Sequence, residues 1–317
     1  MTRNNILFFL TQLAFFFLFI FGSISCCGQN EEEKPSETRR SKLRAGLYVA
    51  TILPANSAAS FYDGYGYDVY GNKNDFGNSF MNKSINFFYG GGNGQPDYVA
   101  TALGVNHGDW SFDETDMPTD LSYNIAFAFG LHTSYCINDR SSIALNFTTS
   151  KLSVSGDFTI VLKTTPVTPQ QPGYINVRTF GIRGSEQRFI FQLGYQHVFG
   201  EEGGFNFFAE GGAVCTMAKF LHNQIAINTL QIDLGGYYSQ VLYEEFRKNN
   251  LSGVGFGAWG GCGMTTSNNA RTTLQFVYNP SLEIISIGQN TDPALHHYIG
   301  LKIYYNLWRR VVTKESF

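Results

Sequence analysis

Histidine and acidic residues that could support catalysis occur together at one place in the sequence. His107, Asp109 and Trp110 lie in a glycine-containing stretch. A lipid-modifying membrane enzyme needs a histidine beside a serine or an acid, because the histidine must activate a nucleophile. A His–Asp pair two residues apart in a glycine-rich loop is weak evidence for such a site. We therefore predict that the protein is not an enzyme.

Metal-ligating residues are the second candidate for chemistry. His296 and His297 are adjacent, and His222 stands elsewhere. Neighbouring residues of a strand point to opposite faces, so one site cannot easily use both members of the pair. The three cysteines beyond residue 30 are scattered and do not form a disulfide framework. We predict neither a metal site nor a cofactor.

Another set of titratable residues falls on the small or polar faces of segments in which large apolar and polar residues alternate. One interpretation is a polar relay or a narrow solute path through an interior. The interpretation that we favour is a network of ion pairs and hydrogen bonds that fills the interior, because buried charges must be paired. These residues are Arg44, His132, Glu210, Glu283 and Lys302.

The clearest alternating segment is residues 121–137, LSYNIAFAFGLHTSYCI. Its odd positions are mostly large and apolar, and its even positions are small or polar. A period of two predicts a strand, and the length far exceeds the usual strand of about 5–6 residues. A membrane barrel places its large apolar side chains in lipid and small or polar side chains in a narrow lumen. Tyr123 and Tyr135, on the predicted lipid face, should be separated by roughly 30 Å, as aromatic girdles require.

Further segments alternate in the same way, and their connections are in turn long and short. Short turns at the periplasm and long loops at the cell surface characterise outer-membrane barrels. The sequence thus predicts an all-β fold, a closed antiparallel up-and-down transmembrane β-barrel of about eight strands. About ten strands would result if the arms of the second long connection were counted separately. Surface loops are predicted near residues 54–118, 152–187, 219–250 and 288–294.

Composition and the chain termini agree with an exported membrane protein. Only 15% of residues are charged and the net charge is -3, so the composition does not indicate a basic surface for binding nucleic acid. Residues 1–29 are predicted to be a cleaved signal peptide, with lipidation of Cys26 and a membrane-anchor helix as alternatives. Residues 30–43 form a polar periplasmic leader, 44–310 the barrel and 311–317 a periplasmic tail.

Aromatic residues gather in the first long loop and predict a contact surface. Tyr, Gly and Asn make adaptable contacts, and the predicted surface consists of Tyr62, Tyr65, Tyr67 and Tyr70. The alternative is that the loops pack on one another as a lid over the barrel mouth. The glycines that flank Trp259 at every second position predict space for one large inward ring.

Several segments carry a resemblance to known proteins. They are the leader ending in Cys27-Gly28-Gln29, the Phe61-Tyr62-Asp63-Gly64 segment, and Phe180-Gly181-Ile182-Arg183-Gly184 leading into Gly194-Tyr195-Gln196. The chain resembles small outer-membrane β-barrel proteins, and more narrowly uncharacterised barrels of Bacteroidota. The last strand resembles the signal that such barrels present to the insertion machinery. The resemblance implies the outer membrane of a Gram-negative bacterium, contact with membrane lipid and with that machinery, and no catalytic residues.

Two functions follow as predictions. The first is interaction of the surface loops with another envelope protein. The alternative is a narrow passage or binding site for small or apolar solutes. A secreted lipocalin-like barrel would need an apolar lumen and a charged exterior, which the outward aromatic residues oppose.

Overall fold

The computed structural model describes residues 42–68, 72–87, 95–163, 175–200, 204–235, 252–269, 272–285 and 293–306. The predicted signal peptide, almost all of the leader, the tail and Tyr70 lie outside these residues. Among the described residues, no helix is long and apolar enough to cross a membrane.

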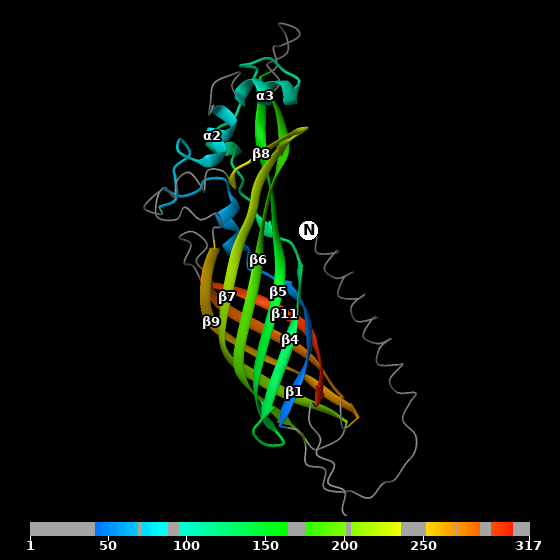
Figure 1. The fold of residues 1–317 in the computed structure, drawn as a ribbon. Helices are drawn as coiled ribbons and strands as arrows, with labels where there is room; N and C mark the ends of the chain where they lie inside the picture. The colour runs from blue at the N-terminus through cyan, green and yellow to red at the C-terminus, as the bar shows by residue number, and fades with distance from the viewer. Residues whose placement is uncertain are drawn as a thin grey trace, which may run out of the picture. The chain divides into compact units, whose positions relative to one another are not determined.

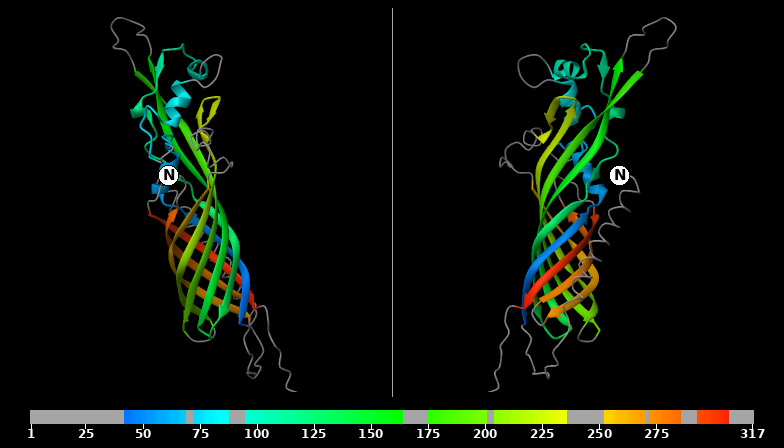
Figure 2. Two further views of the ribbon diagram at one scale, coloured as in Figure 1. Left: turned by 60° about the vertical axis from the view of Figure 1, so that its left-hand side comes forward. Right: turned by 90° about the vertical axis from the view of Figure 1, so that its right-hand side faces the viewer.

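Eight strands form a closed antiparallel ring (Figures 1 and 2). Each strand is hydrogen-bonded to both neighbours, in the order β4, β1, β11, β10, β9, β7, β6 and β5, and β5 returns to β4. The predicted all-β barrel of eight strands is confirmed, and the ten-stranded alternative is wrong. The strands are β1 (Leu43–Leu53), β4 (Ala126–Cys136), β5 (Ser141–Lys163), β6 (Ile175–Phe199), β7 (Phe205–Ile227), β9 (Ser252–Asn269), β10 (Thr272–Ile285) and β11 (Pro293–Asn306).

The barrel exposes its apolar side chains and buries its polar ones. Along β4, for example, Leu131 is 55% exposed whereas His132 is fully buried. This alternation follows from the period of two along each strand, and it is repeated around the ring. We call the outward apolar surface the lipid belt; it includes Leu47, Phe129, Leu131, Ile143, Leu145, Phe191, Leu193, Phe207, Phe256, Leu282, Ile303 and Tyr305.

The predicted strand at residues 121–137 is interrupted, and the lipid-facing position of Tyr123 is wrong. The strand β3 (Ser122–Tyr123) pairs Tyr123 with Val154, whereas β4 pairs Ala128 with Ser150. Between these pairs, the segment that runs from β3 into β4 therefore contains one residue more than β5, which is a β-bulge. A shift of one residue turns the side chains to the other face. Tyr123 consequently points inward and is buried, so it cannot belong to an aromatic girdle.

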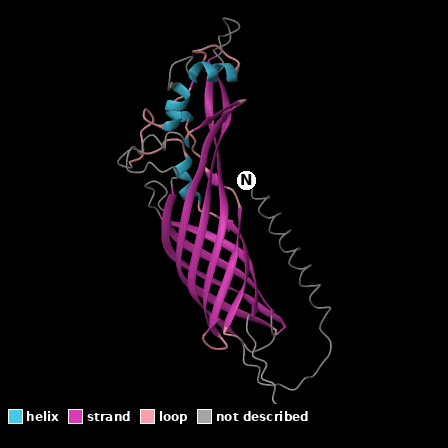
Figure 3. Ribbon diagram, viewed as in Figure 1, coloured by secondary structure: helices cyan, strands magenta, loops and turns pink. Residues whose placement is uncertain are grey.

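Three strands continue past the barrel and carry a folded head (Figures 2 and 3). Residues 152–187, which we predicted as a surface loop, are mainly the paired upper arms of β5 and β6. The short strands β2 (Trp110–Ser111) and β8 (Leu230–Asp233) pair with β5 and β7. We define the head as the described residues within 63–121 together with these arms, 156–163, 175–184 and 223–235. Its helices are α2 (Phe80–Asn86), α3 (Gln95–Leu103) and η3 (Glu114–Asp116), and η2 (Asn56–Tyr62) precedes it.

The head has a hydrophobic core of its own. One face of the strand arms packs against the helices and the chain around Trp110, while the other face is largely exposed. Burial of this apolar surface stabilises the loop excursion as a folded unit. Core residues are Met81, Ile85, Val99, Leu103, Phe112, Met117, Phe158, Ile160, Ile182 and Ile225.

Candidate functional site

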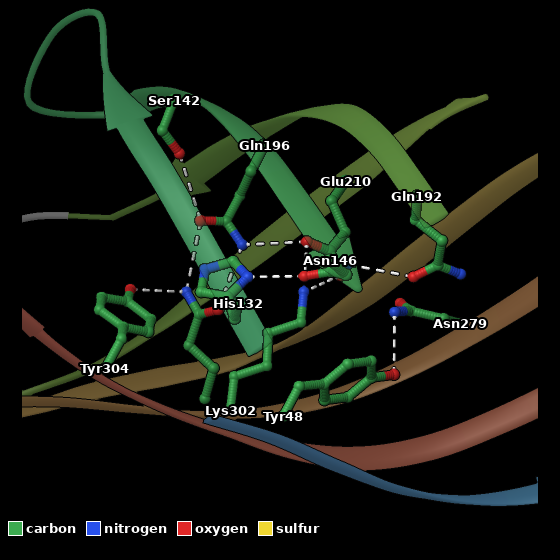
Figure 4. Close-up of polar contacts among 11 residues, drawn as sticks. Tyr48, His132, Ser142, Asn146, Gln192, Gln196, Glu210, Asn279, Lys302 and Tyr304 are labelled. Carbon is green, nitrogen blue, oxygen red and sulfur yellow. Dashed lines mark hydrogen bonds and ion pairs between the residues drawn. The ribbon is translucent and has the colours of Figure 1, made fainter. Parts of the chain in front are cut away.

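A buried ion pair spans the barrel interior (Figure 4). Lys302 Nζ donates to the two carboxylate oxygens of Glu210 at 2.7 and 2.8 Å, and both side chains are fully buried. The ammonium also lies 5.4 Å from the ring centre of Tyr48 and 6.0 Å from that of Trp259. Pairing and cation–π contacts are what a buried cation requires. The two predicted residues therefore satisfy each other's charge.

Amide side chains extend this pair across the lumen. Gln196 donates to Glu210 at 3.2 Å and exchanges hydrogen bonds with Gln275 at 3.3 and 3.4 Å. Gln275 also donates to the hydroxyl of Tyr304 at 3.0 Å. Because β6 and β10 lie three strands apart in the ring, these bonds connect distant walls of the barrel. The interior at this level is filled by side chains, as expected for a small barrel.

His132 and Arg44 lie beside this network without joining the ion pair. His132 Nδ1 is 2.6 Å from Asn146 Oδ1, so Nδ1 carries the proton, and Asn146 donates to Gln192 at 3.1 Å. The rings of His132 and Tyr304 lie 5.2 Å apart, and the Arg44 guanidinium is 5.6 Å from the Tyr304 ring. Among the described residues, His132 Nε2 and Arg44 Nε have no hydrogen-bond partner.

Glu283 belongs to a separate cluster of hydroxyl groups. Its carboxylate accepts hydrogen bonds from Thr216 at 2.5 Å, Ser281 at 2.6 Å and Tyr298 at 3.5 Å. The structure therefore brings Glu210 and Lys302 into contact, and places Arg44 and His132 around Tyr304. Glu283 makes no hydrogen bond with the other four among the described residues.

A second buried ion pair was missed in the sequence. Arg188 Nε lies 2.6 Å from Glu186 Oε1, with both side chains almost fully buried. Arg188 Nη1 lies 3.1 Å from His296 Nε2, on the strand directly opposite in the ring. Glu186 lies inside the predicted surface loop 152–187, so it was not assigned to the inward face of a strand. The available signal was parity, since both residues continue the even-numbered inward positions of Gln192 and Gln196.

The start of the first long loop closes the barrel mouth over this pair. The hydroxyl of Tyr62 donates to Glu186 Oε2 at 2.8 Å, and the Asn223 amide donates to the Tyr62 carbonyl at 3.2 Å. The backbone N–H of Ala55 donates to His296 Nδ1 at 3.1 Å. Tyr62 is fully buried, so it cannot form part of an exposed contact surface as predicted. Tyr65 and Tyr67 are half-buried.

Gly184 provides the space that Tyr62 occupies, which gives a first prediction. A Cβ at Gly184 would collide with the Tyr62 ring, and overpacking of this kind costs about 1–3 kcal/mol. Gly184→Ala should therefore raise the fraction of molecules with a displaced loop by about 5- to 150-fold. Faster trypsin cleavage at Lys73 or Lys83 of the folded barrel would report this. Gly181→Ala, where a Cβ meets nothing within 4 Å, is the matched control; equal cleavage of the two variants would contradict the prediction.

In the described part of the chain, the other candidate histidines lie apart from one another, and His222 Nδ1 lies 2.9 Å from the hydroxyl of Ser185. His107 Nδ1 pairs with Asp97 at 2.9 Å, while the Asp109 carboxylate accepts from Asn106. His297 lies on the outer face of β11 beside Tyr278, opposite to His296. No group of three or more His, Cys, Asp or Glu side chains that could hold a metal is found in the described part of the chain.

The distribution of polarity decides the class of the protein. The exterior of the ring is apolar, whereas its interior holds two ion pairs and a hydrogen-bonded amide network. A soluble barrel would have the opposite arrangement, because lipid is the solvent that favours an apolar exterior. The protein is a transmembrane β-barrel of the outer-membrane type. Closure of its ring leaves no unpaired strand edge in the lipid.

Comparisons with known proteins return structural matches alone. No protein-family model and no curated protein matches the sequence. Outer membrane protein OprG from Pseudomonas aeruginosa is similar, with 10% identity and a TM-score of 0.35 over 86% of this chain and all of that chain (100%). The attachment invasion locus protein Ail of Yersinia pestis, in complex with a heparin analogue, has 10% identity and a TM-score of 0.33, covering 83% and 98%. The N-terminal β-barrel domain of P. aeruginosa OprF has 7% identity and a TM-score of 0.26, covering 84% and 99%.

Proposed function

We propose that the barrel anchors the head at the surface of a Gram-negative outer membrane, where the head contacts another envelope protein. The observation that carries this proposal is the hydrophobic core of the head, formed by segments that lie beyond the lipid belt. A long loop excursion with its own core presents a defined surface, and functional residues are frequently held on such scaffolded loops.

The direction of the barrel supports a head outside the cell. Arg44 pairs with Asn306, so the first and last strands meet at the end away from the head. The ends of β4, β6 and β9 at which the next strand follows after only a few residues lie at this same end. Periplasmic turns are short in outer-membrane barrels. We therefore assign this end to the periplasm, with the insertion machinery as a partner during assembly.

The signal peptide and the bacterial group remain proposals. Residues 1–29 lie outside the described residues, and their charge and apolar pattern support export through a cleaved signal peptide. The resemblance of the leader and of the Phe61-Tyr62-Asp63-Gly64 segment supports a source among the Bacteroidota.

Exposed aromatic residues give the head a contact surface outside the belt. Tyr98 on α3 is 54% exposed and Phe87 at the end of α2 is 56% exposed. Large aromatic side chains are enriched at protein interfaces because they bury much area with few rotatable bonds. These two residues replace Tyr62 as candidates for contact with a partner.

The alternative function, a passage for solutes, has less support. A solute would have to displace the Lys302–Glu210 pair, the Gln196–Gln275 bonds and the Tyr62 ring at the mouth. Separating a buried ion pair is costly because each charge would be left unpaired in the interior. No contact among the described interior residues favours a path through the barrel.

The proposal is tested by photo-crosslinking in living cells of the source organism. A photoreactive residue at Tyr98 should give an adduct with one envelope protein. The same residue at Leu131 of the lipid belt should give none, because that position faces lipid. The same probe is placed at Phe87. If neither position gives an adduct although the barrel is folded and the head is exposed at the cell surface, the proposal is contradicted.

A further inference from the structure

A row of polar residues borders the lipid belt where β5, β6 and β7 leave the ring and continue towards the head (Figures 1 and 2). Strand register places Lys151, Gln187 and Lys219 side by side on these three strands. Phe189 and Met217 lie in the next outward row towards the barrel and belong to the belt. Because residues two positions apart on a strand share a face, the polar row also points outward. We call Lys151 and Lys219 the rim lysines.

The level of this row corresponds to the lipid headgroups. The outward residues Phe189 and Phe199 mark the two ends of the lipid belt on β6. Ten residues at about 3.3 Å, tilted by roughly 40°, cover about 25 Å along the membrane normal, which is the height of the apolar band of outer-membrane barrels. Gln187 and the rim lysines therefore lie one row beyond the hydrocarbon, at the depth of the headgroups.

The rim lysines have no compensating charge in the described part of the chain. Both side chains are exposed, and neither makes a hydrogen bond or an ion pair with another described residue. Gln187, between them, donates to the Thr149 hydroxyl at 2.6 Å, so its amide group is turned towards the belt. The next row towards the head consists of Ser153, Ser185 and His222 and contains no acidic residue. Two ammonium groups thus face the headgroup region without a carboxylate.

The charged residues farther along these strands show a gradient away from the lipid. Arg183 is exposed on β6, two rows beyond Gln187. Asp157 on β5 follows one row later, and Asp233 on β8 pairs with Gln224 in the row of Arg183. On the described outer face of these strands, positive charge therefore borders the lipid belt, and negative charge lies farther towards water.

The cations occupy one side of the ring. The outward residues at the head-side edge of the other five strands are uncharged; on β1, β4, β9, β10 and β11 they are Leu53, Phe127, Ser252, Ile284 and Leu295. Long basic side chains generally favour membrane interfaces, and that preference alone would distribute them around the whole circumference. Two unpaired lysines on one sector instead indicate a localised site for an anion.

We propose that the rim lysines bind the phosphate of one anionic lipid of the surrounding leaflet. Adjacent strands are about 4.8 Å apart, so the two lysine backbones, on strands separated by β6, are roughly 10 Å apart. Their long, flexible side chains can approach one phosphate from both sides as point charges. The acyl chains of that lipid would lie against Phe189 and Met217, so the charged contact continues the apolar one. The orientation proposed above makes this leaflet the outer one.

The test is native mass spectrometry of the full-length folded protein in a non-ionic detergent, with lipids that have the same acyl chains. Phosphatidic acid is the anionic probe, and phosphatidylcholine is the zwitterionic one. The first molecule of phosphatidic acid should bind at least tenfold more tightly than phosphatidylcholine. Lys151→Gln combined with Lys219→Gln should weaken this binding at least tenfold, since each cation near an anionic headgroup strengthens binding about fivefold.

Lys42→Gln combined with Arg140→Gln is the matched control, because it removes two exposed cations at the opposite end of the barrel. This variant should bind phosphatidic acid as tightly as the unsubstituted protein. Equal binding of the two lipids, no loss in the rim variant, or equal loss in both double variants would overturn the proposal. Displacement of the lipid by inorganic phosphate at the same concentration would also overturn it, because the site would then bind a free anion.

Folding of every variant is verified by the heat-dependent gel mobility of the barrel. The lipid measurement needs no partner of the head, so it and the crosslinking experiment fail separately. Selective lipid binding without an adduct at Tyr98 or Phe87 would contradict the partner contact alone. An adduct without lipid selectivity would contradict the lipid site alone.

Discussion

Replacing Lys302 by methionine should destabilise the barrel by about 3–5 kcal/mol, because Glu210 would keep a buried negative charge without a cation. Lys302 Nζ contacts both oxygens of this carboxylate, and both side chains are fully buried. Gln196 donates a single amide hydrogen bond to Glu210, which cannot replace the ammonium. The measurement is equilibrium unfolding in urea from lipid vesicles, followed by tryptophan fluorescence and gel mobility.

A double variant separates the unpaired charge from lost packing. In Glu210→Gln combined with Lys302→Met, the buried charge is absent and the glutamine oxygen can still accept from Gln196. The double variant should therefore recover most of the lost stability, since removal of a whole buried pair is often nearly neutral. If it is as unstable as Lys302→Met alone, packing of the lysine stem accounts for the loss and the electrostatic explanation is wrong.

The inward position of Lys302 and Glu210 could be predicted from the sequence, but their contact could not. Each residue falls on the polar face of an alternating strand, and parity alone assigns that face. Their contact depends on strand order and stagger, because β7 and β11 lie three strands apart in the ring. Nothing in the local pattern of either strand encodes this stagger.

Positions where parity changes show the limit of the same reasoning. By parity Tyr123 continues the lipid face of β4, yet one bulge residue turns its side chain inward. A bulge inserts a single residue and leaves no strong signal in composition. Tyr62 also could not be assigned, because its partner Glu186 lies 124 positions away and Gly184 provides the space for its ring. The orientation and burial of such residues are determined by long-range packing.

The glycines at every second position around Trp259 were easier to interpret. Trp259 points inward, as predicted from its flanking glycines, and its indole donates to the Ala213 carbonyl at 3.0 Å. A Cβ at Gly194, on a strand two positions away in the ring, would crowd the indole. The local pattern predicted the space, and the fold supplied a second glycine to complete it.

Leu131→Arg should prevent stable assembly of the barrel in the membrane. Leu131 lies midway along β4 on the lipid belt, paired with the outward residues Leu47 and Phe147 of the neighbouring strands. An arginine at the midplane of the lipid face of a barrel costs about 2–4 kcal/mol, because its charge must leave water. The expected result is loss of most heat-modifiable protein from the outer membrane. Protein refolded in vesicles should be less stable by the same amount, about 2–4 kcal/mol.

Tyr135→Arg is the matched control, because it places the same charge on the same face of the same strand. Tyr135 lies near the end of β4 that carries the short turn, so its arginine can reach the interface at a cost of about 0–1 kcal/mol. A difference in stability between the two variants shows that the two positions lie at different depths in the membrane. If the exterior faced water, both arginines would be ordinary surface substitutions, within about 0.5 kcal/mol of the unsubstituted protein. Equal stability of the two variants would therefore contradict the lipid belt itself, and with it the assignment of the barrel to a membrane.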